Sequence, residues 1–231
     1  MTYYRLMAAV VAIGLALAPA APRADDDGQE SHGEIRHFQV TITNLTGGQQ
    51  FTPLLLVSHR SPVHLFVLGA AASPQLRTLA EQGNTGPLAT LLRATDGVRE
   101  VVTGTDLTNP GADKSFTIAA GEHERLSIAA MLIPTNDGFV AVDALNLSFA
   151  AQDITVFAPA YDSGTERNDE LCSSIPGPFF KECGGAGGGA QVGGGEGFVH
   201  IHAGIHGVGD LKPALRDWRN PVAKIVIHRL D

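Results

Sequence analysis

The sequence predicts an all-β fold, an antiparallel sandwich or barrel, for most of its 231 residues. Short segments rich in Val, Ile and Thr recur along the chain, separated by Gly, Pro, Asn or Asp, and this spacing is typical of antiparallel β-proteins. No long helices alternate with these segments, so a parallel Rossmann-like sheet is not expected. Hydrophobic residues make up 44% of the chain and charged residues 17%, which is enough apolar material to bury a core.

The first strand is expected over residues 35–43 (IRHFQVTIT), where alternating residues and β-branched side chains favour an extended chain. Residues 53–59 (PLLLVSH) form a short apolar run, as in a buried strand. The last strand is expected over residues 223–229 (AKIVIHR), which alternate and close the domain. Further strands are expected at 100–104, 114–119, 125–133, 139–147 and 153–158.

Two short helices are expected between residues 73 and 93. Ser73 and Pro74 match a helix N-cap followed by proline at the first helical position. Leu76, Leu79 and Ala80 then recur at helical spacing, before glycines interrupt the pattern and a second leucine-rich segment resumes it. The predicted fold therefore carries one or two short helices in an inserted connection.

The first 24 residues have the layout of a secretory signal peptide. A weakly basic start at Arg5 precedes an apolar run over 6–18 and the small residues Ala18-Pro19-Ala20, and an uncleaved anchor is the alternative. Residues 25–34 are expected to be a disordered lead-in and residues 35–231 the domain. We therefore expect a secreted or periplasmic protein.

Cys172 and Cys183 are expected to form a disulfide in an oxidising compartment, with a pair of free thiols as the alternative. The tract at 184–197 is dominated by glycine and fits neither a Walker nor a dinucleotide motif, so it is interpreted as a mobile surface spacer. The net charge of −8 argues against nucleic-acid binding. The chain has no GxSxG elbow and only one Trp, so we expect it not to be an enzyme.

Carboxylates gather in and beside the predicted turns. Asp137 lies in the turn at 134–138, Asp143 in the strand that follows, and Asp162 and Glu166 in the segment YDSGTE. Calcium requires six to eight hard oxygen ligands, and loops at one end of a sandwich can supply them. Ordinary turn chemistry explains the same residues without a metal, and both interpretations stand.

Histidines form a second cluster, at His200, His202 and His206 in FVHIHAGIH. In a strand, His200 and His202 would point to the same face and could bind zinc or copper. A hydrogen-bonded structural seam is the interpretation we favour, because no further ligand has diagnostic spacing.

The chain resembles bacterial spondin-domain proteins and, more distantly, the spondin N-terminal domain of F-spondin and mindin. The resemblance covers nearly all of residues 35–230. It is carried by several separated segments in order: VTITNLT (40–46), QFTP (50–53), LSIAAMLIPTNDGFVAVDAL (126–145), PAYDSGTERNDE (159–170), GFVHIHAGIHGVGDL (197–211) and DWRNPVA (217–223).

This resemblance implies a C2-like antiparallel β-sandwich with a calcium ion held by loop carboxylates. It assigns Asp137 and Asp162 as ligands and matches Asp143 to a strand aspartate of the animal domains. Those domains draw another carboxylate from an upstream strand, but the matching stretch here, 116–120, has no acid. Glu166, Asn168 or Glu170 are its candidate replacements.

The sequence thus predicts an exported calcium-binding adhesion or recognition module without catalytic activity. Its metal ligands would be Asp137 and Asp162, with Asp143 and Glu166 as further candidates. The expected partner is an unknown extracellular or envelope protein or glycan, with no nucleic acid and no integral membrane span after signal cleavage. The alternative function is a transition-metal-binding or hydrolytic protein that uses His200, His202 and His206.

Overall fold

The computed structural model describes residues 34–147, 153–177, 181–184, 187–190 and 193–231. The predicted signal peptide, 1–24, and residues 25–33 of the predicted lead-in lie outside the described residues. Among the helices in the described ranges, none has the length and apolar character that a membrane crossing requires.

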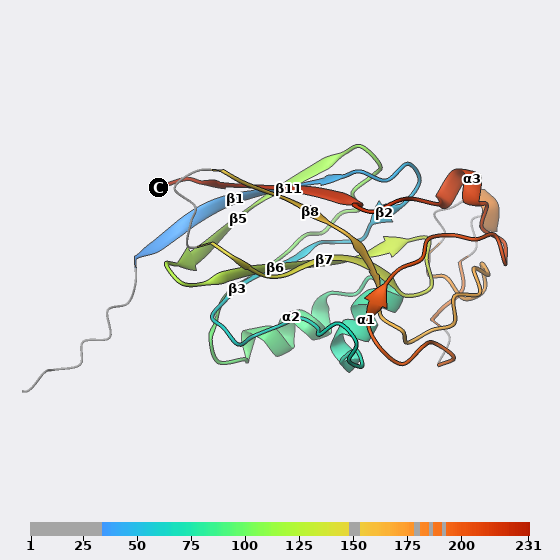
Figure 1. Ribbon diagram of the computed structural model, residues 1–231, viewed down its shortest axis with the longest axis horizontal. Helices are drawn as coiled ribbons and strands as arrows, with labels where there is room; N and C mark the ends of the chain where they lie inside the picture. The colour runs from blue at the N-terminus through green and yellow to red at the C-terminus, as the bar shows by residue number, and fades with distance from the viewer. Residues whose placement is uncertain (1–33, 148–152, 178–180, 185–186, 191–192) are drawn as a thin grey trace, which may run out of the picture. The chain divides into compact units, whose positions relative to one another are not determined.

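Within the described residues, the strands form two antiparallel sheets of four and seven strands, stacked as the predicted sandwich (Figure 1). In the smaller sheet, β1 (Ile35–Asn44) pairs with β5 (Asp113–Gly121) on one side and with β11 (Ala223–Arg229) on the other, and β8 (Ile154–Ala158) pairs with β11. The first and last strands of the chain are therefore neighbours.

The larger sheet runs in the order β10-β9-β7-β6-β3-β4, and β2 also pairs with β6. Its strands are β2 (Gln50–Phe51), β3 (Leu55–His59), β4 (Val98–Thr103), β6 (Arg125–Ile133), β7 (Gly138–Asn146), β9 (Ala160–Asp162) and β10 (His200–Ile201).

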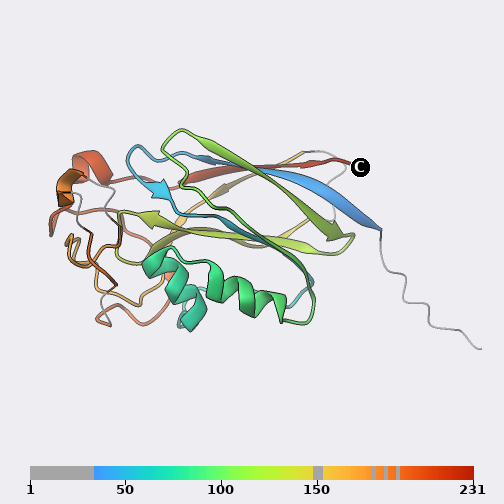
Figure 2. The same ribbon diagram turned by 180° about the vertical axis from the view of Figure 1, so that it is seen from behind.

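Two helices, α1 (Pro74–Gln82) and α2 (Gly86–Arg93), cover the outer face of the larger sheet (Figures 1 and 2). The sheet is therefore buried on both faces. Along β3, Leu56 packs into the core between the sheets, whereas Leu55 and Val57 pack against the helices. Successive side chains of a strand point to opposite faces. This explains why β3 and β6 read as continuous apolar runs and not as alternating ones.

The helix start predicted at Ser73 is confirmed. The Ser73 side chain accepts a hydrogen bond from the Leu76 backbone N–H, and Pro74 takes the first helical position. Gly83 then ends α1 in the left-handed region at φ +64°. The Ser73 cap, Pro74 and Gly83 therefore set the two ends of α1.

The loops after β9 gather at one end of the sandwich, drawn in orange and red in both views (Figures 1 and 2). They include a short 3₁₀ turn at Lys181–Cys183 and the one-turn helix α3 (Pro213–Arg216). The predicted disulfide between Cys172 and Cys183 is present. Apolar side chains from these loops, among them Ile175 and Leu211, complete the core between the sheets.

The interpretation of the glycine tract as a spacer is incomplete. The described part of the tract packs closely on neighbouring backbone. A Cβ at Gly195 would lie 2.4 Å from the Gly164 carbonyl oxygen and 2.7 Å from that of Glu166. Glycine is therefore needed at this position for close approach of two chain segments, and the tract is anchored there.

All eight predicted strands and both predicted helices are present within a few residues of their expected ends. The short strands β2, β9 and β10 and the helix α3 were not predicted. Each spans only two to four residues, too short to show a hydrophobic period. Two of them, β9 and β10, carry the residues of the candidate site.

We expect Leu79→Ala in α1 to lower the free energy of unfolding by about 2–5 kcal/mol, because Leu79 is fully buried against the sheet. Leu91→Ala in α2 is the matched control. Leu91 is 44% exposed, so the same substitution should cost about 0.5 kcal/mol or less. Urea denaturation measures both; equal losses would show that the helices do not pack as described.

Candidate functional site

The site begins with a row of three residues across neighbouring strands. Gly138 at the start of β7 pairs with Asp162 in β9, and Asp162 pairs with His200 in β10. Residues directly opposite in antiparallel strands point to the same face of the sheet. The row faces the core between the two sheets, because the neighbouring Val140 and Ala160 point into that core.

Asp137 lies immediately before this row and is fully buried. Its Oδ2 accepts hydrogen bonds from the Ser163 hydroxyl at 2.9 Å and from the backbone N–H groups of Thr165 at 2.7 Å and Glu166 at 3.0 Å. Its Oδ1 is buried and accepts no hydrogen bond from any described residue. One carboxylate oxygen is thus fixed by the following loop, and the other is left for a ligand.

Asp162 is also fully buried. Its Oδ1 accepts the Gly164 N–H at 2.7 Å, and its Oδ2 accepts the Asn168 side-chain amide at 2.7 Å. Both bonds come from the same loop, 163–168, that holds Asp137. The segment YDSGTERN therefore wraps around the two aspartates, and this explains why its polar residues are so closely spaced.

His202 fills the space that Gly138 leaves. A Cβ at Gly138 would lie 2.8 Å from His202 Cδ2 and 3.1 Å from His202 Nε2. The His202 ring is buried, packs on Trp218 with ring centroids 4.9 Å apart, and places Nε2 4.0 Å from Asp162 Oδ2. The segment DWRNPVA thus supplies the support for His202.

Hydrogen bonds settle the neutral forms of the two site histidines. The Gly204 N–H donates to His202 Nδ1, so neutral His202 carries its proton on Nε2, toward the aspartates. His200 Nδ1 is 3.1 Å from the Ile201 carbonyl oxygen, which can only accept. Neutral His200 therefore carries its proton on Nδ1 and has its lone pair on Nε2.

Glu196 joins His200 and Asp162. His200 Nε2 is 3.3 Å from Glu196 Oε2 and 3.6 Å from Asp162 Oδ1, and one ligand atom from each of the three residues lies within 4.8 Å of the others. The close approach of Gly195 to Gly164 brings Glu196 to this position. Sequence reasoning missed Glu196; its place four residues before His200, at the end of a glycine run, was the available signal.

The electrostatics of the site favour bound positive charge. Burial and the neighbouring Asp162 carboxylate raise the pKa of Asp137, and burial raises the pKa of Asp162. Burial lowers the pKa of His202 to about 4, so this ring is neutral at physiological pH. Burial also opposes charge on His200, but the Ile201 carbonyl and the Glu196 and Asp162 carboxylates raise its pKa overall.

A family model described as Spondin_N matches residues 36–173, more than half of the chain. The chain belongs to the spondin N-terminal domain family. No curated protein matches the chain at a significant level. The matched part of this spondin domain includes Asp137, Asp162 and Glu166, whereas Glu196 and the three histidines lie beyond its end.

The spondin fold separates the predicted ligands. Glu166 is fully buried and its backbone N–H donates to Asp137 Oδ2, but its carboxylate does not form a metal-ligand group with the two aspartates among the described residues. Asp143 does not join them either. Six residues of strand span about 20 Å, so Asp143 lies well along β7, far from Asp137. There its carboxylate is 2.6 Å from His64 Nδ1 and accepts the Leu65 N–H at 2.8 Å. Its expected place in a shared calcium site with Asp137 is therefore corrected.

Two other candidate metal ligands of this spondin domain, Glu170 and His206, do not join the carboxylates of the site. The Glu170 carboxylate accepts the backbone N–H groups of residues 206–208 and so ties two end loops together. The His206 side chain is exposed, and it is not part of the metal-ligand group found among the described residues. The predicted triad of histidines thus divides, and among the described residues only His200 belongs to a metal-ligand group.

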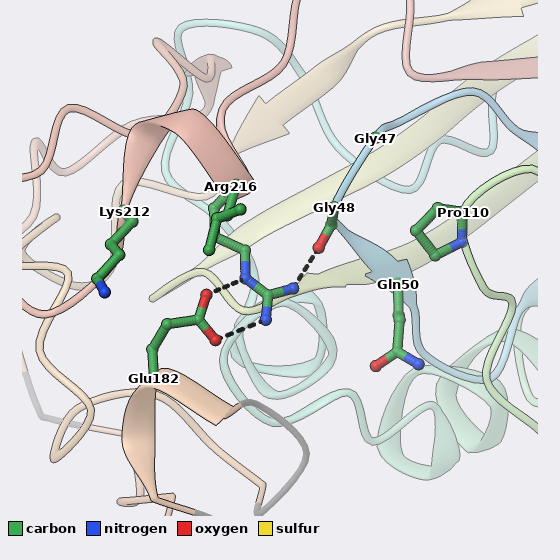
Figure 3. Close-up of a pocket in the computed structure, with 8 residues that line it drawn as sticks. Gly47, Gly48, Gln50, Pro110, Glu182, Lys212 and Arg216 are labelled. Carbon is green, nitrogen blue, oxygen red and sulfur yellow. Dashed lines mark hydrogen bonds and ion pairs between the residues drawn. The ribbon is translucent and has the colours of Figure 1, made fainter.

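A cavity of about 610 Å³ lies at the same end, between the turn at Gly47-Gly48, α3 and the 3₁₀ turn (Figure 3). Arg216 crosses it, donating to both Glu182 carboxylate oxygens and to the Gly48 carbonyl. The Arg216 bonds lower the pKa of Glu182 to about 2, so the pair stays charged. The Arg216–Glu182 ion pair thus joins the walls of this cavity, and none of the predicted metal ligands lines it.

In chelator at pH 8, we expect Asp137→Asn to raise the melting temperature. The carboxamide oxygen keeps the acceptor role of Oδ2, and the charge beside Asp162 is removed. The raised pKa of Asp137 means that the metal-free fold loses stability as pH rises above the ordinary carboxyl range, so the gain should be full at pH 8. For a domain of this size, each 1 kcal/mol gained corresponds to about 2–4 °C.

Asp143→Asn is the matched control for this experiment. Asp143 faces His64 and not a second carboxylate, so removing its charge should bring no gain in melting temperature. A lower melting temperature for Asp137→Asn than for the wild type in chelator would contradict the described repulsion.

Proposed function

We propose that this spondin domain is an exported recognition or adhesion module that binds calcium at Asp137, Asp162 and Glu166 and has no catalytic activity. The observation that carries the proposal is the buried Asp137 Oδ1, which accepts no hydrogen bond from the described residues although it lies beside a second buried aspartate. A buried carboxylate normally has a partner, and a bound cation would supply one here.

The donor atoms are of the chemical type that a hard cation prefers. Asp137, Asp162 and Glu166 offer carboxylate oxygens, which calcium prefers. His202, the neighbouring imidazole, points a neutral N–H and not a lone pair at the aspartates, so it would hydrogen-bond a carboxylate and leave the ion to the oxygens. Bound calcium would offset the repulsion between the two aspartates.

Calcium would also order the surface that surrounds it. The loop 163–168 already donates to both aspartates, so an ion between them would fix this loop against the start of β7. Large apolar side chains remain exposed on neighbouring segments, including Leu171, Phe198, Ile201 and Val208. Exposed apolar groups around a rigid polar centre suit recognition of an extracellular or envelope protein or glycan.

Several features support export and binding without catalysis. The disulfide is typical of proteins that leave the reducing cytosol. Ser163, the hydroxyl nearest the site, donates its proton to Asp137 Oδ2, an arrangement that holds the loop in place. The fixed carboxylates of this rim suit a bound ion that orders a recognition surface.

We expect 10 mM calcium to raise the melting temperature of the wild-type protein by about 3–10 °C. Extracellular calcium modules bind with dissociation constants of about 10⁻⁴–10⁻³ M, which corresponds to about 1.4–2.7 kcal/mol of stabilisation at this concentration. Asp162→Asn should abolish the shift, and Asp143→Asn should retain it. Absence of any shift in the wild type, or a shift that survives Asp162→Asn, would reject calcium binding at this rim.

A further inference from the structure

His200 stands in an environment that a neutral imidazole does not tolerate. Its Nδ1 proton is committed to the Ile201 carbonyl, so the lone pair of the neutral ring lies on Nε2. That nitrogen is 3.3 Å from a Glu196 oxygen and 3.6 Å from an Asp162 oxygen, and it accepts no hydrogen bond within the described residues. A lone pair facing two carboxylates requires a cation between them, either a proton or a metal ion.

The three donors have the spacing of a metal's ligand shell. Zinc binds imidazole nitrogen and carboxylate oxygen at about 2.0–2.2 Å, so neighbouring ligands of a tetrahedral ion lie about 3.3–3.6 Å apart. The two distances at His200 match these separations before any ion is present. The Nδ1–H bond to a backbone carbonyl is also the usual support of a metal-binding histidine.

The neighbouring buried groups face the same carboxylate. The Asp162 side chain is 1% exposed and His202 is 3% exposed, and His202 Nε2 is 4.0 Å from Asp162 Oδ2 without a hydrogen-bond partner among the described residues. His202 therefore approaches Asp162 from the Oδ2 side and His200 from the Oδ1 side. A cation on the Oδ1 side would leave Asp162 Oδ2 as an acceptor for the His202 N–H.

We propose that His200, Glu196 and Asp162 bind a borderline divalent transition metal, zinc or copper(II), at a site that shares only Asp162 with the proposed calcium site. Imidazole nitrogen distinguishes this donor set from the all-oxygen set of Asp137, Asp162 and Glu166, because nitrogen suits zinc and copper and carboxylate oxygen suits calcium. Glu196 is 42% exposed, so the ion is reached from solvent and keeps coordination positions for water or a partner's ligand.

The proposed metal would tie three chain segments together. Glu196 belongs to the glycine-rich loop, His200 to β10 and Asp162 to β9. Strands β9 and β10 pair directly, and the glycine-rich loop is bridged at Gly193 and Gly194 to Glu166. An ion held by all three would fix the end of the glycine-rich loop to the sheet edge. Surface recognition at this end would then depend on zinc or copper as well as on calcium.

The test measures zinc binding by the full chain without a histidine tag. Calorimetry gives the affinity, and equilibrium dialysis with metal analysis gives the stoichiometry. We expect one Zn²⁺ per wild-type chain. His200→Ala and Glu196→Gln should each weaken binding at least about 10–100-fold, since losing a ligand should cost no less than losing an outer-shell partner. Glu196→Gln alters a half-exposed loop carboxylate, so it keeps the test valid if His200→Ala fails to fold.

His228→Ala is the matched control, because His228 is an exposed histidine whose Nδ1 is 2.6 Å from a single carboxylate, that of Asp153. It should bind zinc as the wild type does. Cu²⁺ should report nitrogen coupling in its electron paramagnetic resonance spectrum, lost in His200→Ala. Zinc binding should persist in 10 mM calcium.

Three results would overturn the proposal. The first is the absence of stoichiometric zinc in the wild type. The second is unchanged affinity in both His200→Ala and Glu196→Gln. The third is displacement of zinc by calcium in proportion to calcium concentration, which would show a single site that either ion occupies.

Discussion

The register of β9 between β7 and β10 is the constraint on which the site depends. It sets Asp162 opposite both Gly138 and His200, and it places Asp137 one residue beyond the row. A shift of one residue would turn Asp162 to the helix-covered face, where Tyr161 now packs on Phe139. The aromatic contact on one face and the hydrogen bonds of the loop 163–168 on the other hold this register, so core packing and site geometry are fixed by the same pairing.

Much of the fold could be predicted because its longer strands carry enough residues to show a pattern. The run over β3 predicted a buried strand, the segment over β6 predicted a strand, and Ser73 with Pro74 predicted a helix start. The site was predicted only in part. Turn composition and family resemblance pointed to Asp137, Asp162 and Glu166. Strands β9 and β10, however, are too short for a sequence pattern to predict that they pair. Without that pairing, the distance between Asp162 and His200 cannot be read from 38 positions of sequence separation.

The misassigned Asp143 shows a different limit. Its position six residues after Asp137 in a strand already implied a separation near 20 Å, but the resemblance drew it toward the same ion. In the structure it belongs to a polar group with His64, Ser127 and, through Ser127, the buried His59. Asp137 and Asp143 are close in sequence but lie far apart along β7, whereas Asp137 and Asp162 are distant in sequence and lie at the same end of β7. Glu196 was overlooked for the same reason, since only tertiary contact of Gly195 gives it a role.

The pairing of β1 with β11 has a consequence for how the polypeptide matures. β11 lies between β1 and β8 in the smaller sheet, so neither neighbour has its full complement of backbone hydrogen bonds until residues 223–229 have been synthesised. The family match ends at residue 173, yet the folding unit continues through this strand. A nascent chain carrying only the matched region would expose two unpaired strand edges, which are templates for aggregation. The smaller sheet therefore cannot be completed before residues 223–229 have been synthesised, and a fragment cut at the family boundary would lack the strand that joins β1 to β8.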